Sequence, residues 1–160
     1  MSAGLRLRDA VPGDEALVLR FVRELAEYER LAHEVHATEE ALRQSLFGTP
    51  PRGHALIAEQ DGAEVGFAVW FFTLSTFDGR PGLYVEDVFV TPAARGQGIG
   101  RAIFRDLARR ALAAGCMRME WTVLDWNAPA IGFYHAIGAQ PVIGWTVQRL
   151  RGAALSALAA

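Results

Sequence analysis

Residues 84–114 read YVEDVFVTPAARGQGIGRAIFRDLARRALAA, and most of the expected architecture follows from this stretch. Its first seven residues are mostly apolar and predict a strand, Pro92 begins a turn, and the apolar residues after Gly98 recur at helical spacing. Glycines fill the junction between strand and helix. Because the first N–H groups of a helix have no partner within the helix, we expect this junction to bind an anion.

The spacing of the glycines restricts which anion this is. A Walker loop ends in a lysine, and the chain contains no lysine; a dinucleotide-binding loop has the pattern G-x-G-x-x-G, whereas glycines 96, 98 and 100 are spaced two apart. What remains is Arg-x-x-Gly-x-Gly at residues 95–100, at the start of a helix. At this point a tight helix entry without any ligand stays open as an alternative.

Outward from this stretch, the periodicity of apolar residues predicts alternating strands and helices. Strands are expected at 5–8, 55–59, 64–73, 83–90, 117–124 and 141–150, and helices from Asp14 to about Arg30 and at 38–47, 98–114 and 128–137. Gln60-Asp61-Gly62 predicts a hairpin turn. This order predicts an α/β fold, with a mixed, mostly antiparallel central sheet flanked by helices, in a single domain spanning residues 1–160.

Composition limits the classes of function. The chain has 160 residues, of which 51% are hydrophobic, enough for one domain with a sizeable core. No apolar run approaches the length of a membrane span and no signal peptide is evident, so we expect a cytoplasmic protein without a membrane partner. A net charge of −2 indicates no nucleic-acid partner. The single Cys116 excludes an internal disulfide, and the histidines lack metal-ligand spacing, so no metal is expected.

Charge is uneven along the chain. Residues 14–40 contain eight carboxylates against three arginines. An acidic entrance formed by this segment would attract a polycation. A solvated helix face is the alternative for each single glutamate.

Two carboxylates, Glu86 and Asp87, interrupt the apolar strand that precedes the glycines. Neighbours on a strand point to opposite faces, so one can face a cleft, and a carboxylate inside a half-buried sheet is unfavourable unless it is paired or used. An ion pair with a helix arginine is the alternative. The next residues, 88–90, lie where an extended ligand can pair with the strand backbone.

A second motif, Trp-Asn-Ala-Pro-Ala-Ile-Gly-Phe-Tyr, occupies residues 126–134. Asn127 and Pro129 predict the start of a helix. Tyr134 falls on its second turn, where its hydroxyl is a candidate general acid. A core aromatic residue with a satisfied hydroxyl is the alternative.

Residues 95–100, together with Asn127-x-Pro-x-Ile-x-Phe-Tyr134-x-x-x-Gly138-Ala139, resemble the GNAT acyl-CoA N-acetyltransferases in both halves of their motif. Further stretches narrow the resemblance to the diamine (spermidine/spermine) acetyltransferases and their thialysine-acetylating relatives, and it covers residues 5–150. These stretches are Glu24-Leu-Ala-Glu-Tyr28-Glu29, Thr38-Glu39 leading to Phe47-Gly48, Gly66-Phe67-Ala68 with Phe71-Phe72-Thr73, and Tyr84-Val-Glu86-Asp87-Val-Phe89-Val90.

The resemblance implies an acetyl-CoA-dependent enzyme that transfers an acetyl group directly to a primary amine of a small cationic molecule, and it implies a homodimer. Glu86 would accept the amine proton and Tyr134 would protonate the departing thiolate. The implied acetyl-CoA contacts are Val88, Phe89, Val90, Arg95, Gly96, Gln97, Gly98, Ile99, Gly100, Asn127, Pro129 and Ala130. The implied amine contacts are Tyr28, Glu29, Glu86, Asp87, Glu120 and Trp121.

Glu120 and Trp121 depart from the residues usual in this family, which leaves the choice among polyamine, diamine and lysine-like acceptors open. Two other functions are compatible with the same motifs. One is a GNAT-fold sensor that binds acyl-CoA or a polyamine without catalysis, and the other is a peptide or protein N-acetyltransferase.

Overall fold

The computed structural model describes residues 4–160 and divides into two compact units, one ending at Leu124 and one spanning Asp125–Ala160. The first unit contains the whole sheet. The second contains two helices, α4 (Ala128–Ala136) and α5 (Ala153–Ala159). The single domain expected over residues 1–160 stays a prediction.

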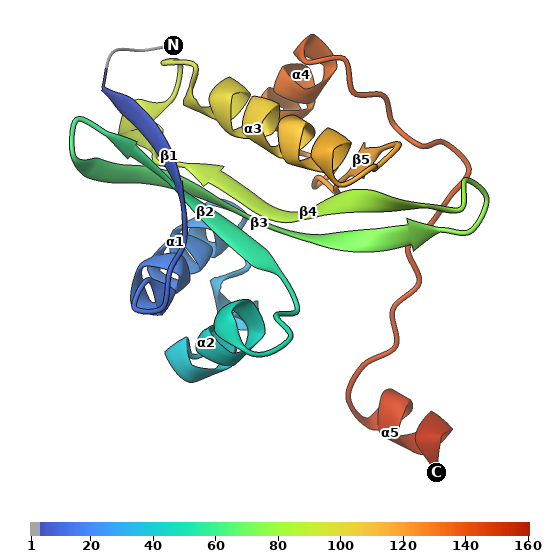
Figure 1. The fold of residues 1–160 in the computed structure, drawn as a ribbon. Helices are drawn as coiled ribbons and strands as arrows, with labels where there is room; N and C mark the ends of the chain where they lie inside the picture. Colours follow the sequence, from blue (N-terminus) through green and yellow to red (C-terminus); the bar gives the residue numbers. More distant parts are fainter. Residues whose placement is uncertain (1–3) are drawn as a thin grey trace. The chain divides into compact units, whose positions relative to one another are not determined.

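The sheet has five strands, which lie side by side in chain order (Figure 1). They are β1 (Leu5–Asp9), β2 (His54–Gln60), β3 (Ala63–Ser75), β4 (Arg80–Val90) and β5 (Met119–Glu120). Each pairs with its neighbour in antiparallel fashion except β4 and β5, which are parallel. The predicted fold class, a mixed and mostly antiparallel sheet flanked by helices, is confirmed.

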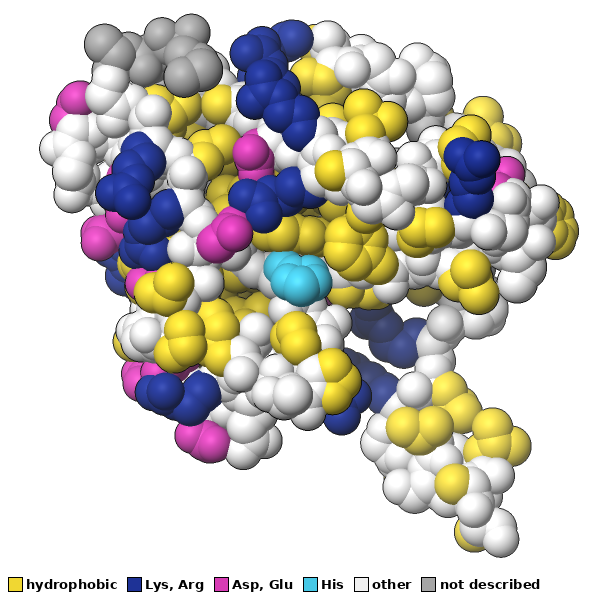
Figure 2. All heavy atoms as spheres, in the orientation of Figure 1, with side chains coloured by type: hydrophobic (Ala, Val, Ile, Leu, Met, Phe, Trp, Pro, Cys, Tyr) yellow, Lys and Arg dark blue, Asp and Glu magenta, His cyan; other side chains and the backbone are white. Residues whose placement is uncertain are grey.

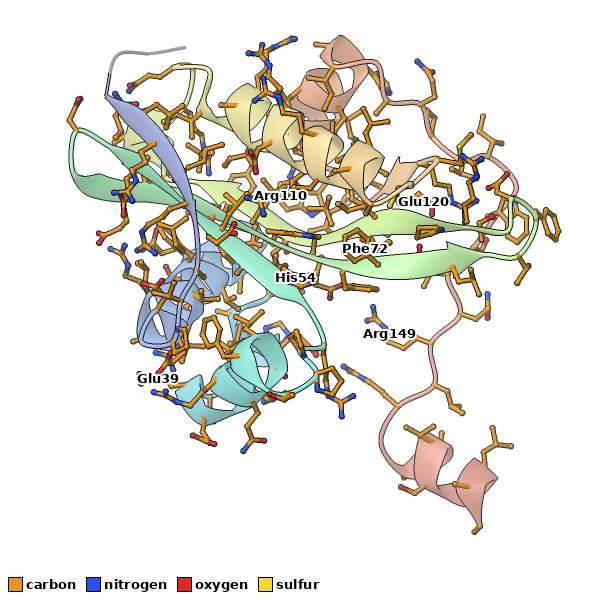
Figure 3. The ribbon with its side chains drawn as sticks, viewed as in Figure 1. Glu39, His54, Phe72, Arg110, Glu120 and Arg149 are labelled. Atoms are coloured by element: carbon orange, nitrogen blue, oxygen red, sulfur yellow. The ribbon has the colours of Figure 1, made fainter. Side chains whose placement is uncertain are left out.

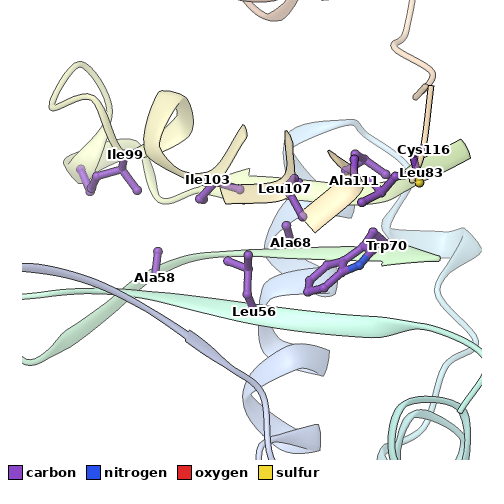
Figure 4. Close-up of a cluster of buried hydrophobic side chains, with 12 residues drawn as sticks. Leu56, Ala58, Ala68, Trp70, Leu83, Ile99, Ile103, Leu107, Ala111 and Cys116 are labelled. Atoms are coloured by element: carbon purple, nitrogen blue, oxygen red, sulfur yellow. The ribbon is translucent and has the colours of Figure 1, made fainter. Parts of the chain in front are cut away.

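Helices cover both faces of this sheet (Figure 1). On one face, α1 (Glu15–Tyr28) and α2 (Glu39–Phe47) enclose a core in which Phe21 stacks on Phe67 with ring centroids 5.3 Å apart. On the other face, α3 (Ile99–Ala113) places its apolar residues against the sheet (Figure 4). That helical stripe consists of Ile99, Ile103, Leu107 and Ala111.

Local sequence signals explain the element boundaries. The β2–β3 turn is made by Asp61 and Gly62, both with positive φ (52° and 84°), as a tight hairpin requires. Thr38 caps α2 by accepting a hydrogen bond from the Ala41 N–H at 3.1 Å. Both features were predicted, and both are confirmed.

Strands β3 and β4 extend beyond their neighbours. Their pairing continues to Ser75↔Arg80, whereas the last partner of β3 on β2 is His54, opposite Trp70. Residues 71–82 therefore form a two-stranded ribbon. Figure 3 labels Phe72 on it and His54 beside it; the two rings are 5.9 Å apart.

Two of the predicted strands differ from the structure: one is shorter than expected and the other is absent. The strand expected at 117–124 is reduced to Met119–Glu120, because its pairing with β4 stops at Tyr84↔Glu120. The strand expected at 141–150 is absent, and these residues form turn and irregular structure. An alternating apolar pattern becomes a strand only against a sheet edge, and β5 offers an edge of two residues.

Candidate active site

A β-bulge in β4 determines the position of Glu86, one of the two carboxylates predicted on this strand. Val85 lies opposite Trp70 and Asp87 lies opposite Val69, so Glu86 is an extra residue without a partner on β3. Val85 belongs to the core under α3, whereas Phe89 belongs to the core under α1. Strict alternation, on which the expectation of opposite faces for the two carboxylates rested, therefore does not hold across the bulge. Glu86 is exposed at this position.

Asp87 lies on the α1 face of the sheet, two residues before Phe89 on the same strand. Burial, and then the negative charges of Glu86 and Glu29, raise its pKa to about 6. Burial also raises the pKa of Glu29. The structure thus brings three of the predicted residues together as a negatively charged group, hereafter the acidic group: Glu29, Glu86 and Asp87.

Neither Glu86 nor Asp87 has an ion-pair partner within residues 4–160. The alternative of a structural pair with a helix arginine is therefore not supported. Three carboxylates that repel one another, with no cationic partner in the part of the chain that the structure describes, provide a favourable place for a bound cation.

Tyr28 and Arg95 lie at the same side of β4. Tyr28 is the last residue of α1 and packs against the core that contains Phe89. The Arg95 guanidinium lies over the Tyr28 ring, with Cζ 4.6 Å from the ring centroid, and 5.5 Å from the Phe89 centroid. Arg95 Nε donates a hydrogen bond to the Val90 carbonyl at 3.0 Å. The side chain that was expected at the pyrophosphate thus rests on aromatic rings in this structure.

The second half of β4 has an open edge. Residues 88–90 pair with β3 through Ala68, Phe67 and Gly66, but β5 pairs with β4 only at Leu83 and Tyr84. Among residues 4–124, no strand covers the other edge of β4 after Tyr84. An extended ligand can therefore form backbone hydrogen bonds along this edge, as a peptide does when it adds a strand to a sheet.

The glycine loop follows directly from this open edge. Gly96 and Gly98 have φ of 77° and 82°, and a side chain at either position would extend into open space. Within residues 4–160, the N–H groups of residues 96–98 donate to no backbone carbonyl. Gly98 is the N-cap of α3, so the positive end of the helix dipole is added to these donors.

The acyl-CoA implied by the resemblance fits these residues. A pyrophosphate would accept hydrogen bonds from the N–H groups of residues 96–98, which donate to no backbone carbonyl within residues 4–160. The extended pantetheine chain would pair along the open edge of residues 88–90, which leads back to the bulge at Glu86. The contacts predicted for Val88, Phe89 and Val90 stay predictions that this geometry supports.

Glu120 and Trp121, the other predicted amine contacts, have structural partners. Glu120 forms an ion pair with Arg118, in which Oε2 of Glu120 is 2.9 Å from Nε of Arg118. Trp121 packs edge-to-face on Phe104, with ring centroids 4.8 Å apart. Trp121 therefore contributes to the core under α3, whereas the acidic group lies toward α1. The structure does not bring these two residues to Tyr28 and Asp87, and their role as amine contacts stays a prediction.

The predicted residues of the second unit form the helix that was expected. Asn127 caps α4 by accepting a hydrogen bond from the Ala130 N–H at 3.3 Å, and Pro129 lies in the first turn. Tyr134 is on the second turn, and its ring packs edge-to-face on Phe133 with centroids 5.6 Å apart. The proton-donor role of Tyr134 and the acetyl-CoA contacts of Asn127, Pro129 and Ala130 stay predictions.

Two further observations concern other kinds of site. Among the described residues, no group of histidine, cysteine or acidic side chains is arranged to hold a metal ion. None of the helices in that part of the chain is long and apolar enough to span a bilayer.

Sequence reasoning placed an extended ligand along the backbone of residues 88–90, but it did not anticipate that the pairing of β4 with β5 stops at Tyr84 or that Arg95 stacks on Tyr28. On the paired side of β4, Gly66 lies opposite Val90, and a Cβ at this position would come within 2.6 Å of the Phe89 carbonyl oxygen. Glycine here permits close approach of β3 to the strand that carries the open edge.

Comparison with known proteins identifies the family to which this chain belongs. Residues 19–139 match the Acetyltransferase (GNAT) family. The chain is 42% identical to the thialysine N-epsilon-acetyltransferase of Bos taurus, over 98% of each protein. It is 34% identical to spermidine/spermine N(1)-acetyltransferase-like protein 1 of Homo sapiens, over 84% of this chain and 20% of that one. An integron cassette protein from V. cholerae superposes with a TM-score of 0.81 at 25% identity, covering 99% of both chains. The chain therefore belongs to the GNAT family of acetyltransferases.

Proposed function

We propose that this acetyltransferase moves the acetyl group of acetyl-CoA directly to the primary amine of a small cationic acceptor. The observation that carries the proposal is a continuous path on one strand. Free N–H groups at residues 96–98 lead along the open edge of residues 88–90 to the bulge with its acidic group. A thioester bound along this path would have its acetyl group beside carboxylates that attract an amine.

Glu86 is the proposed proton acceptor. An alkyl ammonium has a pKa of about 10.4, so it must lose a proton before it can attack a carbonyl carbon. Glu86 is exposed at the bulge and can take that proton directly or through water. Asp87 is half-buried, and its pKa of about 6 leaves it mostly ionised at neutral pH, so it can attract the cation.

In the proposed transfer, the amine nitrogen forms a bond to the acetyl carbon as the carbon–sulfur bond breaks. The amine proton passes to Glu86, and Tyr134 donates a proton to the departing thiolate. No covalent enzyme intermediate is needed. Cys116 is unsuited to form one, because it is buried and its burial raises the pKa of the thiol.

A lysine-like amine is the first acceptor to test, and a polyamine or diamine is the second. The names of the relatives at 42% and 34% identity refer to thialysine and to spermidine or spermine. Both acceptor types carry a second charged group besides the reacting amine. The acidic group, with Glu29 and Asp87 as well as Glu86, supports the preference for such a multiply charged molecule.

The test is an acceptor panel. Purified protein is mixed with acetyl-CoA and, in separate reactions, with thialysine, lysine, putrescine, spermidine and a lysine-containing peptide, and free thiol is followed over time. We expect turnover with at least one small amine. Tight retention of CoA with no turnover would favour the sensor function, and turnover with the peptide alone would favour a protein acetyltransferase.

We also propose a homodimer. The ribbon at residues 71–82 exposes three large apolar side chains, Phe72, Leu74 and Phe77, the last of them 97% exposed. Apolar side chains also gather on the surface over β2 and β3 (Figure 2). Burial of these groups against a second copy would remove them from water. Light scattering coupled to size exclusion tests this, and a monomer at all concentrations would contradict it. A cytoplasmic location stays a prediction.

A further inference from the structure

Two aromatic rings lie on the same face of the sheet as Asp87. Phe71 on β3 is opposite Tyr84 on β4, and their ring centroids are 5.2 Å apart with the ring planes tilted by 34°. Val69, two residues before Phe71, is opposite Asp87 and packs against the core under α1. Because side chains two residues apart on a strand share a face, Phe71 and Tyr84 are also on the α1 face. Phe71 and Tyr84 are hereafter the aromatic pair.

The register of β3 and β4 brings the aromatic pair close to the acidic group. Phe71 is the diagonal neighbour of Asp87 across the two strands. Diagonal neighbours are about 7–8 Å apart, a distance that an aromatic side chain can reach. On β4, Val85 alone separates Tyr84 from Glu86 at the bulge. The rings and the carboxylates therefore border one stretch of the α1 face.

The aromatic pair belongs to neither of the two cores. Both rings are half-buried, and neither packs in the core under α1 or in the core under α3. Within residues 4–160, no arginine lies over either ring, and the Tyr84 hydroxyl has no hydrogen-bond partner. The partly exposed surface of the two rings is therefore available to a ligand that approaches the acidic group.

An alkyl ammonium combines the two properties that such a surface recognises. Its charged end is attracted by carboxylates and by the faces of aromatic rings. Its carbon chain is apolar, so burial of the chain against the rings is favourable. The acidic group would hold the ammonium, and the aromatic pair would hold the chain that carries it.

We propose that Phe71 and Tyr84 bind the carbon chain next to the reacting amine of the acceptor and so help to select which amine is acetylated. This inference rests on the proposed function, and it adds two residues to the predicted amine contacts. It also ranks acceptors of similar charge. A sulfur atom about 5 Å from an aromatic ring makes a favourable contact, so the thioether chain of thialysine should bind better than the all-carbon chain of lysine.

Steady-state kinetics at saturating acetyl-CoA, with thialysine, lysine and spermidine as acceptors, tests the proposal. Phe71→Leu and Tyr84→Leu keep an apolar side chain but remove a ring. In both variants the KM of each acceptor that is turned over should rise by about 3–10-fold with little change in kcat, because the lost contact serves binding alone. The preference for thialysine over lysine, as the ratio of their kcat/KM values, should fall by about 2–10-fold.

Two variants serve as matched controls. Tyr84→Phe keeps the ring and should keep the preference for thialysine. Phe72→Leu removes the neighbouring ring on β3, which is opposite Leu83 on the α3 face (labelled in Figure 3). It should keep both the acceptor KM and the preference. Acceptor KM values and a preference that are unchanged in both Phe71→Leu and Tyr84→Leu would overturn the proposal, and so would equal changes in Phe72→Leu.

A binding measurement separates failure of this inference from failure of the proposed function. In protein labelled with ¹³C-phenylalanine and saturated with CoA, which carries no acetyl group, thialysine and spermidine are titrated in turn. The ring signal of Phe71, identified by its loss in Phe71→Leu, should shift, and that of Phe72 should not. If no amine is acetylated but the Phe71 signal shifts, the proposed transfer fails and the contact with the amine stands. If neither amine shifts the Phe71 signal, the inference is overturned, whether or not turnover is seen.

Discussion

Residues 83 and 84 of β4 pair with β3 on one side and with β5 on the other, whereas residues 87–90 have a strand partner only on the β3 side within residues 4–124. At Leu83 and Tyr84, both edges of β4 are hydrogen-bonded to neighbouring strands. Leu83 and Val85 also belong to the core under α3. The second half begins with an unpartnered glutamate and ends at the glycine loop. One strand thus serves as scaffold at one end and as the proposed binding surface at the other, and the bulge at Glu86 separates the two ends.

The largest effect is expected from Glu86→Gln, at the boundary between the halves. Loss of the proposed proton acceptor should lower turnover by about 10²–10⁴-fold, the usual contribution of general base catalysis. Because Glu86 is exposed and unpaired, stability and CoA affinity should hardly change. Glu64→Gln, an exposed carboxylate on β3, is the control for steady-state kinetics. Turnover of Glu86→Gln equal to that of the unaltered protein would exclude this role.

Leu83→Ala tests the scaffold half. Leu83 is 1% exposed, and its truncation should lower the free energy of unfolding by about 2–5 kcal/mol, as for other buried leucines. Val88→Ala, in the open half where burial is only partial, should cost less. Urea unfolding followed by circular dichroism gives both values. Equal losses at the two positions would show that the halves do not differ in packing.

Asp87→Asn tests how much the buried charge of Asp87, in the open half of β4, lowers the stability of the folded protein. A carboxyl whose pKa is raised to about 6 in the folded protein, from 3.8, binds more protons folded than unfolded between these values. Stability should therefore fall as pH rises from 3.8 through 6, by at most about 3 kcal/mol for this group. The variant should lose this dependence and be more stable at neutral pH. Parallel curves of melting temperature against pH for the two proteins would contradict the raised pKa.

The smallest effect is expected from Gly98→Ala in the glycine loop. Alanine at a φ of 82° costs about 1–2 kcal/mol of backbone strain. If the loop relieves this strain by changing its backbone angles, its N–H groups no longer point at one anion, and CoA affinity should fall by about tenfold or less. Gly79→Ala, at a φ of 62° in the ribbon turn and equally open, introduces comparable strain away from the loop. Calorimetric titration with CoA should separate the two variants. A similar affinity in both would mean that the loop does not hold the pyrophosphate.

Much of this fold could be predicted, because its signals are local. The Asp61-Gly62 turn, the Thr38 cap and the glycine junction before α3 each depend on a few neighbouring residues. Proximity of Glu29, Glu86 and Asp87 was expected from the family resemblance, which implies that all three contact the amine.

What could not be predicted depends on pairing between distant segments. The bulge at Glu86 exists only relative to Val69 and Trp70, and the sequence of β4 alone shows simple alternation. The length of β5 also depends on pairing: its pairing with β4 stops at Tyr84, and the strand expected to Leu124 therefore ends at Glu120. The position of Arg95 depends on where α1 ends, beside β4 and more than sixty residues earlier in the chain.

The central claim is that the open half of β4 and the glycine loop together bind acetyl-CoA. Hydrogen exchange followed by mass spectrometry, with and without CoA, tests it most directly. The account predicts that CoA slows exchange in peptides covering residues 86–100 and leaves peptides covering residues 71–84 unchanged. Saturating CoA without protection of residues 86–100, or with equal protection of both segments, would contradict it.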